Sequence, residues 1–461
     1  MLTRLFLFAF VYLFTAAASA GPDDPYYSSK DSWGHGRDDQ WALKRINWPA
    51  NFDGANLEPV IVAVIDTGVD YYHPDFDPNT IWRNRKETFN GRDDDKNGFV
   101  DDLVGWNFID GNYNPWDKAG HGTHVAGVIA AATNNGIGIA GMNPAAQIMS
   151  LKALNFLGGG HSTEVAQAIY YAVDNGAKVI NLSLGAEHVS KVQQRAVNYA
   201  AENDVLVIAA AGNTGIEVKE FGPAGLENVL TVGASDFDDD KAGFSNWGQK
   251  IDVVAPGIDV LSLRARRTDI ALSAGTEDYK VGDNFVGDPA RYYRVAGTSF
   301  STPFVSGLAS MIRAQRPELS AEDVRRMIVY SARDVSTPGV DNYTGHGIID
   351  VAAALKADPE FFIDAGISGV SIVQEGGGQF VQVQGIANAD RLDSAWVEIG
   401  KGEDPSSFKR VTDRLSKAVQ GGAVGNIPVG ELRDATQWTL RLVVKHANGR
   451  QQEARFQLNL G

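Results

Sequence analysis

The sequence has no cysteine among its 461 residues, so a disulfide framework, a thiolate metal site and a cysteine nucleophile are all excluded. Basic residues are also outnumbered, at 41 against 57 acidic ones, and the formal net charge is −16. A chain this acidic is not expected to take nucleic acid or another polyanion as its main partner. Its stability therefore has to come from core packing or from bound ions.

Long apolar runs are scarce as well, and the one at the N-terminus is short. Leu5–Phe14 follows Arg4 and precedes Ala18-Ser19-Ala20, which is the pattern of a secretory signal peptide and its cleavage site. Ten apolar residues are too few to cross a bilayer as a helix. We therefore predict a signal peptide over residues 1–20, no membrane span once it is removed, and a protein secreted to the exterior or the cell envelope.

Hydrophobic residues make up 44% of the chain, enough for a sizeable core and too many for a disordered protein. Short Val/Ile-rich runs alternate with helical patterns, which predicts parallel strands buried on both faces. The runs are Val60–Ile65, Gln147–Leu151, Lys178–Leu184, Val205–Ala211, Val229–Val232 and Ile251–Val254, and the clearest helices are Glu164–Asn175 and Lys191–Glu202. The sequence therefore predicts an α/β domain with a three-layer parallel sheet over residues 21–358.

The pattern changes after Pro359 to an alternation of apolar and polar residues broken by glycine and polar turns. Phe380–Val383, Ala395–Ile399 and Thr439–Val444 show this period of two, which is typical of half-buried antiparallel strands. About a hundred residues suffice for one small domain. These segments resemble the fibronectin-type or immunoglobulin-like sandwich modules appended to secreted enzymes. We therefore expect a second, all-β sandwich domain over residues 359–461, with spacing or stabilisation favoured over specific binding as its role.

Two motifs in the first domain place an acid and a base near strand and helix ends. Asp66 closes the first predicted strand, where open α/β sheets carry functional groups, although a capping aspartate would look the same. His121 begins the motif HGTHVAG at the start of a predicted helix, whose positive dipole end favours a neutral imidazole. A zinc site is not favoured, because metalloprotease helices space their histidines by four with a glutamate beside the first.

Two further motifs place an amide and a hydroxyl in similar positions. Asn213 ends the apolar run AAAGN and is either a turn residue or a donor to developing negative charge. Ser299 lies in GTSFSTP, near the N-terminus of a predicted buried helix with Pro303 in its first turn. A lone serine at such a position is commonly a cap.

The four motifs together, in the order Asp, His, Asn, Ser, resemble the subtilisin-like serine proteases over about residues 24–355. The resemblance implies that Ser299 is the nucleophile and His121 the base, with activity falling as His121 protonates near the ordinary pKa of about 6.5. It also implies that Asp66 orients the imidazole and that Asn213 helps to hold the oxyanion. The alternative is a catalytically silent binding or adhesion protein on the same scaffold.

The same resemblance implies how a protein or peptide substrate would bind. An edge segment would pair with the extended peptide main chain, and residues at the end of a neighbouring strand would line the pocket for the side chain before the scissile bond. The edge residues are Ser183, Leu184 and Gly185, and the pocket residues are Ala210, Ala211 and Gly212. Phe221, in a turn that often begins with tyrosine in the family, would close part of that pocket.

Carboxylates gather in one loop that has the pattern of a calcium site. Its candidate ligands are Asp93, Asp95, Asn97, Asp101 and Asp102. Oxygen ligands alternate there around a glycine, as in calcium loops, but Val104 stands where an EF-hand has its closing glutamate. Because clustered carboxylates repel unless a cation joins them, structural calcium is favoured over a solvated run of charge.

A second calcium site follows from the resemblance alone. Its side-chain ligands would be Asp24, Asp75 and Asn135, and its carbonyl ligands would come from Thr133, Ile137 and Ile139.

The chain also departs from the family pattern. Asp24 follows the predicted cleavage site almost at once, so we expect no pro-segment, and two segments resemble insertions, namely Ser28–Asp39 and Arg264–Tyr293. The second insertion precedes the nucleophile and could border the cleft.

Overall fold

The computed structural model describes residues 21–52, 54, 57–266, 268, 284–287 and 291–460. The predicted signal peptide, residues 1–20, and most of the predicted insertion Arg264–Tyr293 lie outside the described residues. Within the described part of the chain, no helix combines the length and the hydropathy that a membrane crossing requires.

A seven-stranded parallel sheet forms the centre of the first part of the chain, in the order β2-β3-β1-β4-β5-β6-β7. The strands are β1 (Val60–Asp66), β2 (Gly105–Asn107), β3 (Ala146–Lys152), β4 (Val179–Leu182), β5 (Leu206–Ala210), β6 (Val229–Ser235) and β7 (Val253–Pro256). Almost every residue in them is buried, as Val/Ile-rich strands require when helices cover both faces. The predicted α/β class is confirmed.

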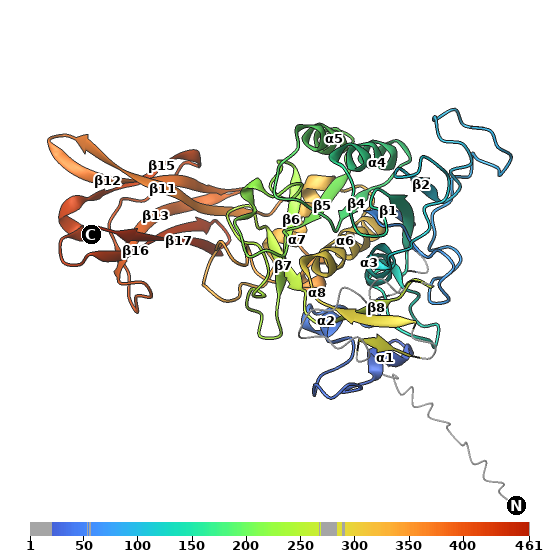
Figure 1. Cartoon of the computed structure of the whole chain (residues 1–461). Helices are drawn as coiled ribbons and strands as arrows, with labels where there is room; N and C mark the ends of the chain where they lie inside the picture. Colours follow the sequence, from blue (N-terminus) through green and yellow to red (C-terminus); the bar gives the residue numbers. More distant parts are fainter. Residues whose placement is uncertain are drawn as a thin grey trace, which may run out of the picture.

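The helices complete a three-layer arrangement (Figure 1). In Figure 1, α4 and α5 lie side by side above the sheet, and α3 and α6 pack together below it. The main helices are α3 (His121–Ala130), α4 (Ser162–Asp174), α5 (Lys191–Glu202), α6 (Thr298–Gln315) and α7 (Ala321–Ser331). Short helices are α1 (Pro25–Ser28), α2 (Trp41–Arg45) and α8 (Val351–Ala354), with 3-10 turns η1 (Val218–Glu220) and η3 (Val429–Leu432). A small antiparallel sheet contains β8 (Val260–Leu263), β9 (Phe285–Val286) and β10 (Tyr292–Val295).

The central helix α6 is buried along nearly its whole length, which explains why small residues punctuate its sequence. A Cβ atom at Gly307 would lie 2.4 Å from the Cβ of Met142, so only glycine lets this helix approach its neighbour so closely. The N-terminus of α6 is thereby held at the carboxyl edge of the sheet, where open α/β folds place their ligands.

The C-terminal part contains two antiparallel sheets, in the orders β11-β12-β15 and β14-β13-β16-β17. Their strands are β11 (Ile363–Glu375), β12 (Gly378–Ala389), β13 (Leu392–Lys401), β14 (Lys409–Arg410), β15 (Val419–Pro428), β16 (Gln437–His446) and β17 (Gln451–Asn459). They enclose a hydrophobic cluster distinct from that of the α/β part. The predicted all-β module is confirmed, and its three predicted strands fall within β12, β13 and β16.

Candidate active site

Asp66 and His121 form a close pair at the carboxyl edge of the sheet. Asp66 is the last residue of β1 and is fully buried, and His121 is the first residue of α3. The Nδ1 atom of His121 lies 2.8 and 2.9 Å from the two carboxylate oxygens of Asp66. A Cβ atom at Gly122 would lie 2.1 Å from the Gly68 carbonyl oxygen, so this glycine is what allows α3 to begin so near β1.

A second buried carboxylate, Asp117, ties the loop before α3 to the end of β1. Its oxygens accept hydrogen bonds from Ala119 N, Gly120 N, Thr67 Oγ1, Thr123 N and Thr123 Oγ1. The hydroxyl of Thr67 in turn accepts from Gly122 N at 3.0 Å. This network fixes the first turn of α3 and with it the position of His121. Asp117 was not predicted from sequence, because its partners are assembled only by the fold.

The pKa of His121 reflects two opposing effects. Burial lowers it, but the adjacent Asp66 carboxylate and, further away, Asp117 raise it, and the net direction is upward from 6.5. A full negative charge at 2.8 Å outweighs the partial charge of a helix dipole. His124, by contrast, faces no such carboxylate, and burial lowers its pKa to about 3. The helix-start argument for a neutral His121 is therefore overridden by its carboxylate partner.

Ser299 is the second residue of α6 and is joined to Ser183 by two hydrogen bonds. The Ser299 hydroxyl donates to the Ser183 carbonyl at 3.1 Å, and the Ser183 hydroxyl donates to the Ser299 carbonyl at 2.7 Å. Pro303 explains the second bond, because a proline has no N–H to offer the carbonyl four residues earlier. We expected Pro303 in the first helical turn, but α6 begins at Thr298 and Pro303 is its sixth residue. Ser183 supplies the missing donor.

One cleft joins two of the three side chains, and Asp66 lies buried behind His121. Both His121 and Ser299 line it, and the His121 ring centroid lies 5.1 Å from that of Phe300, the residue after Ser299. The Ser299 hydroxyl donates to Ser183 rather than to His121. Serine–histidine hydrogen bonds are often long in free enzymes and tighten when substrate binds, and a rotation about one side-chain bond re-aims the hydroxyl.

Asn213 follows β5, and its side-chain amide has a defined direction. Its Oδ1 atom accepts hydrogen bonds from Thr298 N at 2.8 Å and from Thr298 Oγ1 at 2.9 Å. With the oxygen held, the Nδ2 group remains as the donor available to the cleft, which Asn213 lines. Thr298 was missed by sequence reasoning, although it lies beside Ser299 in the motif. In the first turn of α6, the N–H groups of Thr298 and Phe300 are already bonded to Asn213 and to the Gly297 carbonyl. The Ser299 N–H, which has no intrahelical acceptor, is the further donor here.

The cleft itself has a volume of about 1450 Å³ and is lined by most of the predicted substrate-binding residues. Those residues are Ser183, Leu184, Gly185, Ala210 and Gly212. Ala211 contributes main-chain bonds instead, from its N–H to Val232 O at 2.9 Å and from Asn246 Nδ2 to its carbonyl at 2.8 Å. Ala211 therefore fixes the main chain between the lining residues Ala210 and Gly212 without lining the cleft itself.

Phe221 forms one wall of this cleft and explains two of the glycines. A Cβ atom at Gly185 would lie 2.2 Å from Phe221 Cε1, and one at Gly212 would lie 2.7 Å from Phe221 Cζ. Any larger residue at either position would therefore displace the ring. Gly212 also has a φ of 103°, which disfavours residues with a side chain.

In the acidic loop, the structure brings together Asp93, Asp95 and a residue that the sequence analysis missed, Glu87. One oxygen from each lies within 4.8 Å of the other two. Asn97 lies beside them, and its N–H donates to both Asp93 and Asp95 at 3.1 Å. Carboxylate and amide oxygens at this spacing are typical calcium ligands. Glu87 is separated from the loop in sequence, so alternation within residues 93–102 did not reveal it.

The other two predicted ligands of this loop have different partners. Asp101 accepts hydrogen bonds from the N–H groups of Asn90 and Gly91 at 2.8 and 3.0 Å, so its carboxylate closes the preceding turn. Asp102 is fully buried and accepts from Tyr171 Oη at 2.5 Å and Asn84 Nδ2 at 2.8 Å. Both side chains stabilise the loop from its inner side.

The second predicted calcium site is assembled around two buried carboxylates. Asp24 and Asp75 are both fully buried, and Asn135 Nδ2 donates to Asp75 at 2.8 Å. Burial raises the pKa of Asp24, and burial together with the Asp24 charge raises the pKa of Asp75 to about 7. Among the described residues, the buried hydroxyl of Thr133 has no hydrogen-bond partner. These features fit a site that a cation would complete. Ile137 and Ile139 flank it in the same loop, and the Ile139 N–H donates to Asp75 at 3.1 Å.

The comparisons with known proteins agree with this geometry. Residues 58–347 match the Subtilase family, Peptidase_S8, and the chain belongs to this family. It is 38% identical over 340 residues to the thermophilic serine proteinase of Bacillus sp. (strain AK1), covering 74% of this chain and 70% of that protein. It is 33% identical over 335 residues to thermitase of Thermoactinomyces vulgaris, covering 73% and 99% of the two chains.

Solved structures give the same result for the fold. A structure described as proteases from Pseudoalteromonas arctica PAMC 21717 matches with a TM-score of 0.56 and 27% identity, covering 73% of this chain and 99% of that one. A lanthipeptide protease matches with a TM-score of 0.52, also at 27% identity, over 72% and 94% of the two chains. The protein is thus a serine endopeptidase of the subtilase family, and its substrates are proteins or peptides.

Proposed function

We propose that this chain hydrolyses peptide bonds through an acyl-enzyme formed on Ser299, with His121, Asp66 and Asn213 as the other catalytic residues. The observation that carries the proposal is the contact of His121 Nδ1 with both oxygens of the buried Asp66 carboxylate, at 2.8 and 2.9 Å. That contact leaves Nε2 as the free ring nitrogen, in the cleft that Ser299 also lines.

Each residue then has one task in the reaction. Ser299 Oγ attacks the substrate carbonyl while His121 Nε2 removes its proton, and Asp66 stabilises the imidazolium that forms. The oxyanion accepts hydrogen bonds from Asn213 Nδ2 and from the Ser299 N–H. His121 gives the proton to the departing amine, and water, activated by the same nitrogen, hydrolyses the acyl-enzyme.

Substrate binding in this proposal relies on main-chain pairing with the segment Ser183, Leu184 and Gly185. The side chain before the scissile bond enters the pocket bounded by Ala210, Gly212 and Phe221. Because main-chain hydrogen bonds carry the recognition, many peptide sequences are accepted in extended form.

The experiment that tests the proposal combines cleavage of a denatured protein with covalent labelling. A fluorophosphonate reacts with activated serines, so we expect one adduct, which peptide mapping locates at Ser299, and parallel loss of cleavage. Heat-denatured protein provides the control, since an unfolded chain has no activated serine. An adduct elsewhere, or cleavage that persists after full labelling of Ser299, would contradict the assignment.

The pH dependence of kcat/KM follows from the pKa of His121. The base works only when neutral, and its pKa is raised above 6.5, so activity is expected to fall as the pH drops through a value higher than 6.5. Cleavage of a neutral peptide substrate from pH 5 to 9 measures this acid limb, with Tm recorded at each pH to exclude unfolding. A rate that stays constant down to pH 5 would rule out His121 as the base.

We also propose structural calcium, one ion held by Glu87, Asp93, Asp95 and Asn97, and another by Asp24, Asp75 and Asn135 with the carbonyl oxygens of Thr133, Ile137 and Ile139. Bound calcium would supply charge neutralisation and cross-linking of loops. Asp101 and Asp102 would act as supports of the first site.

Removal of calcium by a chelator is therefore expected to lower Tm. When the free calcium concentration is 100 times the Kd of a site, binding at that site adds about 2.7 kcal/mol to the free energy of unfolding. Calorimetry with and without calcium measures this, and the calcium-dependent part should shrink in both Asp75→Asn and Asp93→Asn. Asp238→Asn is the matched control, because Asp238 lies in the acidic run 236–240, to which we assign no ligand role. An unchanged Tm in the parent would contradict both sites.

Finally, we propose that the chain is exported by the signal peptide of residues 1–20 and that residues 21–358 and 359–461 are two domains. The separate hydrophobic clusters of the two parts support this division. Secretion from an expression host, followed by N-terminal sequencing at Gly21, would test the first point.

A further inference from the structure

The N-terminal loop, residues 29–39, reaches the substrate cleft, and none of the catalytic steps above uses it. Its base is closed by a bridge between Lys30 and Asp38. Asp39 is buried and accepts hydrogen bonds from the hydroxyls of Ser29 and Ser32 and from the Ser32 N–H. Because its base is tied down, this loop can hold a side chain in a fixed position.

Arg37 lies next to the base of the N-terminal loop and lines the cleft. The Asp31 N–H donates to the Arg37 carbonyl at 2.6 Å, and the Asp31 carboxylate accepts from Gly36 N at 2.6 Å. The Arg37 guanidinium carbon then lies 3.6 Å from the centroid of the Phe237 ring. Stacking of this kind orients a guanidinium and leaves its N–H edge free for a planar anion.

The strand order defines which end of the cleft Arg37 occupies. Ser183 follows β4 and Asn213 follows β5, and both contact the first turn of α6. Phe237 and Asp259 follow β6 and β7, further along the same edge, and both line the cleft together with Arg37. If the acyl half of a peptide lies over β4 and β5, its leaving-group half continues over the ends of β6 and β7.

Charge makes Arg37 distinctive at this end. It is exposed, and among the described residues no ion pair includes it, whereas two nearby carboxylates are already paired with other cations. Asp38 pairs with Lys44 at 2.9 Å, and the buried Asp259 pairs with Arg294 at 2.5 Å. The positive charge of Arg37 is thus available to a ligand.

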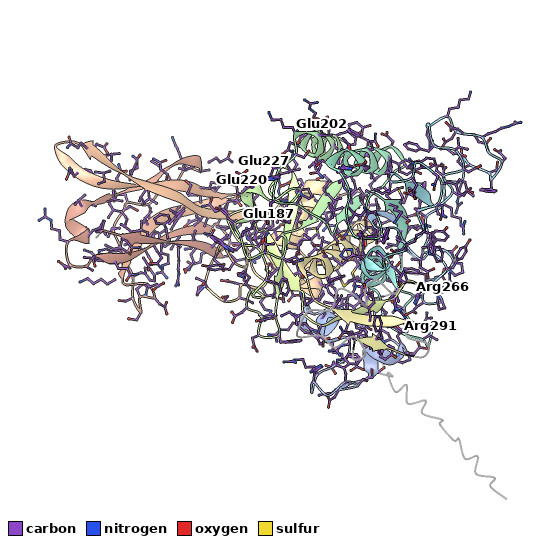
Figure 2. All side chains as sticks on the ribbon, in the orientation of Figure 1. Glu187, Glu202, Glu220, Glu227, Arg266 and Arg291 are labelled. Carbon is purple, nitrogen blue, oxygen red and sulfur yellow. The ribbon has the colours of Figure 1, made fainter. Side chains whose placement is uncertain are left out.

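Two glutamates flank the part of the cleft that contains Gly185 and Phe221, without lining the cleft themselves. Glu187 follows the edge segment and Glu220 precedes Phe221; both are exposed, and Figure 2 shows them on the same side of the molecule. An acidic substrate side chain would be repelled there and attracted by Arg37. These charges therefore discriminate between orientations of a charged peptide.

We propose that Arg37 is a specificity-determining residue that binds a carboxylate on the leaving-group half of the substrate, an Asp or Glu side chain shortly after the scissile bond. The inference rests on the proposed function, since it requires cleavage at Ser299. An exposed arginine–carboxylate pair gives about a fivefold preference in kcat/KM over a neutral residue. Screening by salt weakens this preference.

The test is digestion of a peptide library, with cleavage sites identified by mass spectrometry. The parent should enrich Asp and Glu at one position after the cleaved bond by about fivefold. Arg37→Ala should lose the enrichment and Arg37→Glu should shift it toward Lys and Arg. Lys30→Ala is the matched control, because Lys30 belongs to the same loop but does not line the cleft, and it should behave like the parent.

Two further measurements separate a role of Arg37 in specificity from a general effect on proteolysis, and a side-chain carboxylate from a C-terminal one. A peptide p-nitroanilide has no residue after the scissile bond, so the parent and Arg37→Ala should hydrolyse it at equal rates. Peptides ending in a free or an amidated C-terminus distinguish a terminal carboxylate from a side chain. Identical library profiles for the parent and Arg37→Ala would overturn the role of Arg37 while leaving proteolysis intact; failure to hydrolyse the p-nitroanilide would overturn both.

Discussion

Replacement of Ser299 by alanine is expected to lower kcat about a millionfold, the loss known for the equivalent change in subtilisin. In the proposed mechanism the Ser299 hydroxyl forms the acyl-enzyme, and its loss leaves the oxyanion donors and the binding cleft in place. A residual rate of about a thousandfold or more over water is therefore expected from those groups alone. Single-turnover cleavage of a fluorogenic peptide, with enzyme in excess, measures such a low rate.

Ser301→Ala is the matched control for this experiment. Ser301 lies two residues further along α6 and is fully buried, and within the described structure its hydroxyl has no hydrogen-bond partner. Loss of that hydroxyl should change neither kcat nor folding appreciably. Equal activity of Ser299→Ala and Ser301→Ala would show that the nucleophile is elsewhere, and circular dichroism of both variants would confirm that each is folded.

The buried elements were the easiest to predict from sequence. The helix Lys191–Glu202 is confirmed at both ends, because apolar residues repeat along one face and Ser190 and Asn203 bound it. The strand Val60–Ile65 differs from β1 only by the added Asp66. The three-residue strand β2 was missed, since Gly105–Asn107 has no periodicity and is defined by its pairing with β3.

The candidate site residues were predicted from motifs, but the residues that contact and orient them were not. Asn213 was identified from its strand-end position, yet the direction of its amide depends on two hydrogen bonds from Thr298. Similarly, Glu87 joins Asp93 and Asp95 only because the loop folds back. Contacts of this kind depend on tertiary structure, so local sequence patterns do not predict them.

Arg37 illustrates the same limit in a functional setting. The segment Ser28–Asp39 was identified from sequence as an insertion without a role. Its approach to the cleft depends on the stacking of Arg37 on Phe237 and of Trp33 beneath Arg294, with separations of 3.6 and 4.3 Å. These partners lie some 200 residues or more away in sequence, so only the fold reveals the contact.

Replacement of Asp66 by asparagine is expected to lower kcat about ten-thousandfold. The geometry would change little, because asparagine has the same shape and the site is fully buried. An amide N–H that points at His121 Nδ1, however, stabilises the tautomer with the proton on Nε2. That nitrogen then has no lone pair with which to accept the Ser299 proton.

The pH profile of Asp66→Asn separates this mechanism from simple misfolding. The Asp66 carboxylate is the main influence that raises the pKa of His121 against the lowering effect of burial. Without its charge the pKa should fall, so the acid limb of kcat/KM should move to lower pH even as the rate drops. A misfolded variant would lose activity at every pH and lower Tm without such a shift. If the acid limb of a folded variant remained at the parent's position, Asp66 would neither raise the pKa of His121 nor orient its ring.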